Sequence, residues 1–69
     1  MKLSARNVLK GTVLSVNHGA VNSEIVLQLP GGEQLVSVIT KQSAEDLKLE
    51  VGSVAYAVIK ASNVMIAVD

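Results

Sequence analysis

A chain of 69 residues with no cysteine and one histidine, His18, has no disulfide and cannot build a zinc site from several thiolates or imidazoles within one subunit. Its formal net charge of zero argues against a general nucleic-acid binder, because such proteins normally carry a basic face. Hydrophobic residues make up 49% of the chain, more than so small a core easily hides, so we expect a homo-oligomer.

The chain contains no apolar run that approaches the ~20 residues of a membrane-spanning helix. Its first residues, Met1 to Asn7, lack the apolar core of a signal peptide. We therefore expect a cytoplasmic protein without a membrane partner.

The first half of the chain predicts three strands. Alternation over residues 8–16 indicates the first strand, with Val13 on one face and Val16 on the other. Residues 17–20, which include His18, are typical of a turn. Two more strands, at 24–29 and 34–39, are joined as a hairpin by the turn residues Pro30 to Glu33.

The second half predicts one short helix and two strands. Residues 40–49 favour the helix, with Thr40 or Ser43 as its N-cap. The strands follow at 54–59 and 63–68, and both are apolar on their two faces. Strands of that kind are usually covered on both sides, here by the barrel core and by a partner subunit.

The resulting order is β-β-β-α-β-β over a single domain, residues 1–69. This order predicts a mainly β fold, a five-stranded OB-like Greek-key barrel with one short helix after the third strand. The last strands of such a barrel return to the first strand. We therefore expect Lys60 to lie near Ser4, Arg6 and Asn7, either within one subunit or across an interface.

No arrangement of residues points to catalysis. No nucleophile is paired with a base, since serines are present but the single His18 lies in a predicted turn, and the adjacent acids Glu45 and Asp46 point to different faces of the helix. The sequence contains no glycine-rich phosphate-binding loop, because Pro30-Gly31-Gly32 is better explained as a hairpin turn. We therefore do not expect an enzyme.

Two acid-free segments are rich in hydrogen-bond donors: Ser4-Ala5-Arg6-Asn7 and Lys60-Ala61-Ser62-Asn63. Charged and neutral donors of this kind suit a compact anion, and the small alanines leave backbone N–H groups accessible. The hydroxyls of Thr40 and Ser43 would add donors near the start of the helix. Judged as isolated strings, these segments are better explained as ordinary polar ends of strands and turns.

Three blocks together change this interpretation: Ser4 to Asn7 before an apolar strand, Ile39 to Ser43 before a short helix, and Val58 to Val64 near the end. In this order and spacing they resemble the molbindin (Mop) family over essentially the whole chain. The resemblance implies a bacterial cytoplasmic protein that binds molybdate and tungstate. It also implies a homohexamer, a trimer of dimers, with oxyanion sites at subunit interfaces.

The resemblance further implies which residues bind. The interface site would be lined by Ser4, Arg6, Thr40, Ser43 and Lys60, with backbone donors at Ala5 and Ala61 and with Asn7 and Ser62 adjacent. A second site on a symmetry axis would use the loop of His18, Gly19, Ala20, Val21 and Asn22, although a solvated turn explains His18 better.

The function implied is intracellular storage or homeostasis of molybdenum or tungsten. No organic cofactor is expected, because Tyr56 is the only aromatic residue that could stack on a pterin. One alternative is a regulatory module that senses the oxyanion and acts on a partner. The other is a nucleic-acid-binding OB module, which the single aromatic residue and zero net charge disfavour.

Overall fold

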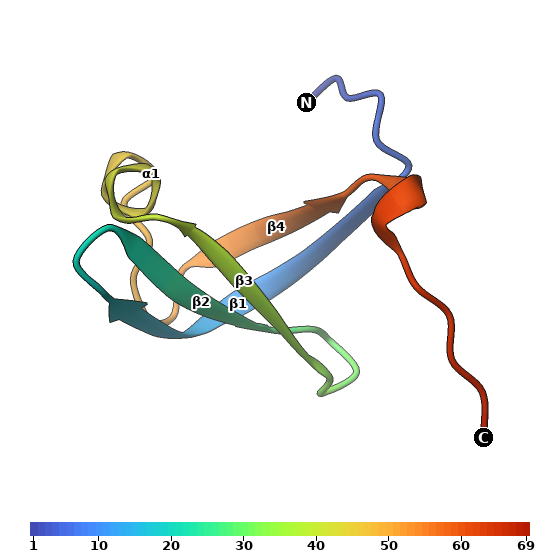
Figure 1. Cartoon of the computed structure of the whole chain (residues 1–69). Coiled ribbons are helices and arrows are strands. Elements are labelled where there is room, and N and C mark those ends of the chain that lie inside the picture. The colour runs from blue at the N-terminus through green and yellow to red at the C-terminus, as the bar shows by residue number, and fades with distance from the viewer.

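The computed structural model describes residues 1–69 and contains one antiparallel four-stranded sheet, curled into a half-barrel, with strand order β3-β2-β1-β4 (Figure 1). The strands are β1 (Asn7–His18), β2 (Asn22–Gln28), β3 (Gln34–Thr40) and β4 (Val54–Ile59). A short helix, α1 (Lys41–Asp46), follows β3, and a 3₁₀ turn, η1 (Ala61–Asn63), follows β4. The mainly β class and the helix after the third strand are confirmed.

A β-bulge at Leu14 interrupts the alternation of β1. The pairing with β2 shifts there, from Val13 opposite Leu27 to Val16 opposite Ile25. Because Leu27 and Ile25 lie on the same face of β2, the bulge places Val13 and Val16 on one face. The prediction that these two valines lie on opposite faces is therefore wrong, since strict alternation cannot anticipate an inserted residue.

The hairpin between β2 and β3 is confirmed. Seven residue pairs join the two strands, from Asn22 opposite Thr40 to Gln28 opposite Gln34. In the turn, the N–H of Leu29 donates to the carbonyl of Glu33 at 2.8 Å, and Gly32 adopts a φ of +94°. That left-handed conformation favours glycine, which explains the residue at this position.

Helix α1 begins at Lys41 because Thr40 caps it. The Thr40 side chain accepts a hydrogen bond from the N–H of Ser43 at 3.0 Å, which satisfies one of the free donors of the first turn. The buried side of the helix is Ala44, which joins the core cluster with Val13, Ile25 and Leu27. Of the two capping residues considered, Thr40 is therefore the correct one.

The core of the single chain is small. Only 6 of 69 residues are buried, whereas apolar side chains of β1 and several valines of β3 and β4 remain exposed. Exposed apolar surface on this scale is typical of interfaces, and it supports the expectation of a homo-oligomer.

The expected fifth strand at 63–68 is wrong for the single chain. Residues 64–69 form no strand, and all of them are exposed. The physical reason is that no strand of the same chain lies beside them to accept their backbone hydrogen bonds. The sheet therefore has four strands and stays open between its two edge strands, β3 and β4.

Replacing Gly11 by alanine is expected to reduce the free energy of unfolding by about 1–3 kcal/mol, because an added methyl group overpacks this site. A Cβ on Gly11 would lie 2.9 Å from the backbone carbonyl oxygen of Gln28, which cannot move without disturbing the ladder. Urea unfolding at fixed chain concentration measures the loss.

The matched control is Gly31→Ala, where the added Cβ would meet only the flexible Glu33 side chain. This change should alter the free energy of unfolding by less than about 0.5 kcal/mol. Equal losses in both variants would contradict the tight packing of β1 against β2 at Gly11.

Candidate functional site

The ladder between β1 and β4 brings the two donor segments together. Asn7, the first residue of β1, pairs with Ile59, the last residue of β4, and its side-chain amide donates to the Ile59 carbonyl at 3.2 Å. Residues 4–6 and 60–62 therefore leave the same end of the ladder, as Figure 1 shows where the N-terminal segment passes η1. The expectation that Lys60 lies near this segment is confirmed.

The η1 turn presents the second donor segment to solvent. The N–H of Asn63 donates to the Lys60 carbonyl at 2.8 Å, and the N–H of Val64 donates to the Ala61 carbonyl at 3.2 Å. Lys60, Ala61 and Ser62 are all exposed, as are Ser4 and Arg6, while Ala5 and Asn7 are half-buried. Two cations and several neutral donors thus occupy one end of the fold.

Thr40 and Ser43 lie at the other end of the same sheet. Thr40 pairs with Asn22 beside the β1–β2 hairpin, and the N–H of Lys41 donates to the Val21 carbonyl at 2.8 Å. Twelve-residue β1 separates this hairpin from Arg6, a length of roughly 40 Å along the strand at about 3.3 Å per residue. One chain alone does not bring Thr40 and Ser43 to the other predicted site residues.

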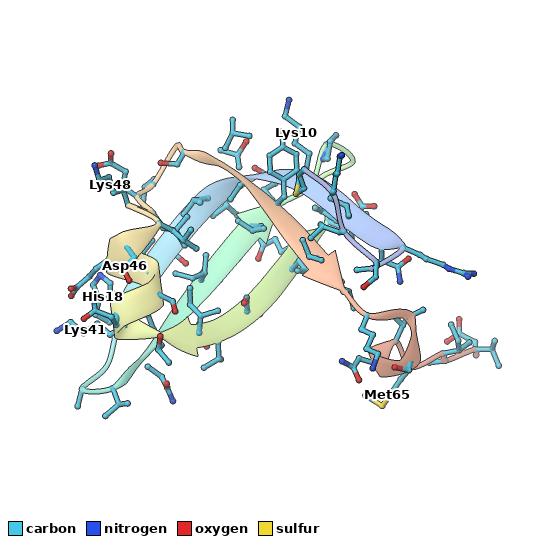
Figure 2. The ribbon with its side chains drawn as sticks, turned by 90° about the horizontal axis from the view of Figure 1, so that it is seen from above. Lys10, His18, Lys41, Asp46, Lys48 and Met65 are labelled. Atoms are coloured by element: carbon cyan, nitrogen blue, oxygen red, sulfur yellow. The ribbon has the colours of Figure 1, made fainter.

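Figure 2 shows the same separation. His18 lies beside α1, of which Lys41 is the first residue, and Met65 lies at the opposite end of the molecule, beyond η1. A site that contains all of the predicted residues therefore needs at least two chains.

The cap of α1 limits what Thr40 has to offer a ligand. Its hydroxyl accepts from the N–H of Ser43 at 3.0 Å and donates to the Ser43 hydroxyl oxygen at 2.8 Å. Ser43 uses its N–H in the first bond and its hydroxyl oxygen as acceptor in the second. Neither bond uses the hydroxyl hydrogen of Ser43. Ser43 is therefore the better placed of the two hydroxyl donors.

Replacing Thr40 by alanine is expected to lower the free energy of unfolding by about 1 kcal/mol, the usual loss when an N-cap side chain is removed. Thr40→Ser keeps the hydroxyl and should retain most of that stability. Thermal unfolding followed by circular dichroism compares the two variants with the unsubstituted protein. Equal destabilisation by alanine and serine would contradict the capping role.

His18 has a structural partner that the sequence did not reveal. It is the last residue of β1, not a turn residue, and its Nδ1 lies 2.6 Å from the hydroxyl of Ser23. Ser23 is buried, so this contact satisfies a polar group inside the fold. The period of two in β2, which puts Ser23 on the same face as Ile25 and Leu27, is the signal that predicts its burial.

The rest of the predicted second site is a short exposed loop. Gly19 donates its N–H to the Asn22 carbonyl at 2.7 Å, which closes the connection between β1 and β2. Gly19, Ala20, Val21 and Asn22 are all exposed. The structure thus groups this loop with Thr40 and Ser43, and not with Arg6 and Lys60.

A family model described as TOBE domain matches residues 3–66. The "Probable molybdenum-pterin-binding protein" of Haemophilus influenzae is 46% identical over 69 residues, which are 100% of both chains. The chain belongs to the TOBE-domain family, among its small single-module Mop proteins. The resemblance to that family is therefore confirmed.

Two solved Mop-type structures are close to this Mop chain. MopII from Clostridium pasteurianum is 40% identical, covers 97% of this chain and 100% of its own, and superimposes with a TM-score of 0.92. ModG, described as a cytoplasmic molybdate-binding protein and solved with molybdate bound, is 51% identical with a TM-score of 0.91. The match to ModG covers 94% of this chain and 46% of the ModG chain.

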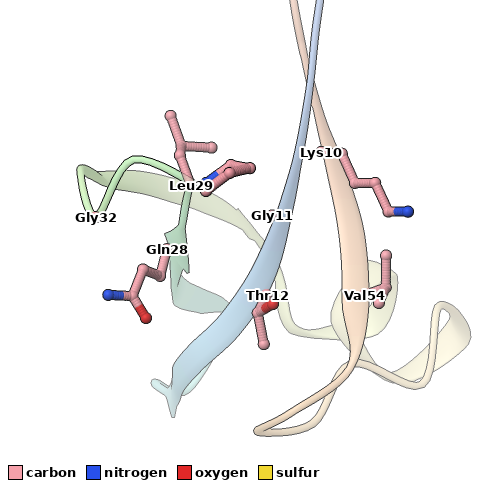
Figure 3. Close-up of a pocket in the computed structure, with 8 residues that line it drawn as sticks. Lys10, Gly11, Thr12, Gln28, Leu29, Gly32 and Val54 are labelled. Atoms are coloured by element: carbon pink, nitrogen blue, oxygen red, sulfur yellow. The ribbon is translucent and has the colours of Figure 1, made fainter.

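Elsewhere the Mop chain offers little that would compete with the two ends of the sheet. A pocket of about 510 Å³ lies beside β1, with Lys10 and Val54 on one side and Gln28 and Leu29 on the other (Figure 3), and it contains none of the predicted site residues. No three histidine, cysteine or acidic side chains gather as a metal-ligand cluster. Neither helix is long and apolar enough to cross a membrane.

Proposed function

We propose that this chain binds molybdate, and tungstate in the same way, as free oxyanions held between copies of itself. The observation that carries the proposal is the 51% identity and 0.91 TM-score to ModG with molybdate bound, joined to the donor segments at one end of β1. The names of relatives include pterin. A shell of small hydrogen-bond donors suits a compact anion better than a pterin, because the chain has only one aromatic residue that could stack on a pterin ring.

In the proposed interface site, Arg6 and Lys60 neutralise the dianion and donate charge-assisted hydrogen bonds. Ser4 and Ser43 donate hydroxyl hydrogens, Thr40 positions Ser43, and the backbone N–H groups of Ala5 and Ala61 complete the shell. Asn7 and Ser62 support it from either side. The hairpin of His18, Gly19, Ala20, Val21 and Asn22 is the proposed second site, of which His18 is bonded to Ser23.

A site made of donors selects by protonation. Molybdate, tungstate and sulfate are unprotonated dianions at neutral pH, whereas phosphate keeps protons that would meet no acceptor in this shell. Rejection of sulfate then depends on its smaller size, which a cavity formed between rigid chains can detect. We therefore expect strong discrimination against phosphate and sulfate.

The proposed assembly is a homohexamer, a trimer of dimers. Its support is the exposed apolar surface of the single chain and the position of Thr40 beside the far end of twelve-residue β1 from Arg6, which leaves the predicted site residues apart in one chain. The proposed role is storage or homeostasis of molybdenum in the cytoplasm, the compartment given for ModG.

Isothermal titration calorimetry of the purified protein tests the ligand. Molybdate and tungstate should each give a saturable binding isotherm, and sulfate or phosphate at the same concentration should give only heat of dilution. Absence of saturable heat with both molybdate and tungstate would overturn the proposed function.

A further inference from the structure

Asn7 occupies the end of the ladder at which both donor segments begin. It is the first residue of β1 and pairs with Ile59, the last residue of β4. Arg6 directly precedes Asn7, and Lys60 directly follows Ile59. Each of the two cations of the proposed interface site is therefore one residue away from this pair.

One side-chain hydrogen bond joins the two segments at this point. The Asn7 amide nitrogen, Nδ2, donates to the Ile59 carbonyl oxygen at 3.2 Å, across 52 residues of sequence. That carbonyl belongs to the peptide unit from which Lys60 extends. Both Asn7 and Ile59 are half-buried, which strengthens the bond relative to one in open water. The Asn7 side chain thus holds the backbone on which Lys60 is placed.

No other hydrogen bond connects residues 1–6 with residues 60–69. The bond from the N–H of Asn63 to the Lys60 carbonyl lies within the η1 turn and does not reach the other segment. Lys60 stands at the N-cap position of η1, and its side chain makes no capping bond there. Asn7 is therefore the last connection between the two donor segments.

Two effects oppose a fixed arrangement of these segments. Arg6 and Lys60 are both exposed cations, and like charges on neighbouring segments repel each other. The end of a strand pair also opens more easily than its middle, because it has neighbours on one side only. A hydrogen bond at the last pair opposes both effects.

The chemistry of the amide group fixes how Asn7 is oriented. A carbonyl oxygen only accepts, so the group that faces Ile59 must be the NH₂ of Asn7 and not its Oδ1. Oδ1 is itself an acceptor and cannot bind an oxyanion, which also only accepts. The donor end of the side chain is therefore engaged with the backbone, and this favours a positioning role over direct contact with a ligand.

We propose that Asn7 is a positioning residue, which holds the Ile59 carbonyl so that Lys60 stays beside Arg6 before the oxyanion binds. This inference rests on the proposed binding of molybdate. Preorganisation of the two cations reduces the entropy that is lost when the Lys60 segment becomes ordered around the ligand. Asn7 then raises the affinity through Lys60 and without contact to the oxyanion.

A double-mutant cycle with Lys60 tests this role. Asn7→Leu keeps the approximate size of the side chain and removes the donor, so calorimetry should show about three- to tenfold weaker molybdate binding, the loss expected for one hydrogen bond. In a Lys60→Ala background the same change should weaken binding less than about twofold, because the cation that Asn7 positions is absent. In the control background Lys10→Ala, which removes another exposed lysine of the β1–β4 ladder, the full loss should appear.

Two results of the cycle would overturn the proposal. An equal loss from Asn7→Leu with and without Lys60 would show that Asn7 contacts the ligand directly or acts only through general stability. Unchanged affinity in Asn7→Leu would show that the bond to Ile59 has no part in binding. Absence of molybdate binding by the unsubstituted protein would instead contradict the proposed function.

Amide hydrogen exchange of the oxyanion-free protein tests the positioning without a ligand. The Asn63 amide, bonded to the Lys60 carbonyl, should exchange about three- to tenfold faster in Asn7→Leu, because η1 loses its connection to β1. Asn7→Ala, which adds no larger apolar group, should give the same result. The Gly19 amide, bonded to the Asn22 carbonyl at the other end of β1, is the control and should not change. Equal Asn63 exchange with and without the Asn7 amide would overturn the proposal, whatever the protein binds.

Discussion

Replacement of Arg6 or Lys60 by alanine is expected to weaken molybdate binding roughly 10- to 100-fold in each case. A hydrogen bond to a charged group contributes about 1.5–3 kcal/mol, and each substitution also removes one of the two cations of the proposed interface site. Both side chains are exposed in the single chain, so folding should be little affected. Calorimetric titration of each variant with molybdate measures the loss.

Lys10→Ala is the matched control for these substitutions. Lys10 is also an exposed lysine, but it lies within the β1–β4 ladder opposite Tyr56, away from the donor segments. Its removal should change molybdate affinity less than threefold, while the free energy of unfolding of all three variants stays within about 0.5 kcal/mol of the unsubstituted protein. Unchanged affinity in both Arg6→Ala and Lys60→Ala would contradict the assignment of the site.

Leu27→Ala is expected to have the largest effect on stability, a loss of about 2–5 kcal/mol in the free energy of unfolding. Leu27 is 4% exposed, pairs with Val13 and Leu35 on its two sides, and belongs to a core of four buried hydrophobic residues. A domain of this size has little stability in reserve, so the variant should be largely unfolded or measurable only with ligand present. Urea unfolding at fixed chain concentration follows the change.

The control for Leu27 is Leu47→Ala, which removes the same atoms from a side chain that is 66% exposed. This variant should lose less than about 1 kcal/mol unless an interface between chains buries Leu47. If Leu47→Ala lowers the free energy of unfolding as much as Leu27→Ala does, Leu47 must be buried against another chain.

Local chemistry made much of this fold predictable. Gly32 at a positive φ, Thr40 as an N-cap and the alternation of β2 each depend on neighbours within a few residues. The bulge at Leu14 was not predictable, because it depends on how β2 pairs across from it. The fifth strand was wrong for the same kind of reason, since a strand exists only where another strand accepts its hydrogen bonds.

The candidate site was also predictable from the sequence only in part. The proximity of Lys60 to Arg6 follows from the antiparallel ladder between the first and last strands, and the order of elements was enough to predict it. Thr40 and Ser43 belong to the same predicted site but lie at the other end of β1. In the proposed site a second chain would bring them to Arg6 and Lys60, and the pattern of one sequence does not position that chain.

Native mass spectrometry of the full chain, with and without added molybdate, tungstate and sulfate, tests the central claim most directly. We predict a hexamer that gains discrete masses of molybdate or tungstate and none of sulfate, with no mass that corresponds to a pterin. A monomer that takes up no oxyanion would contradict both the assembly and the function.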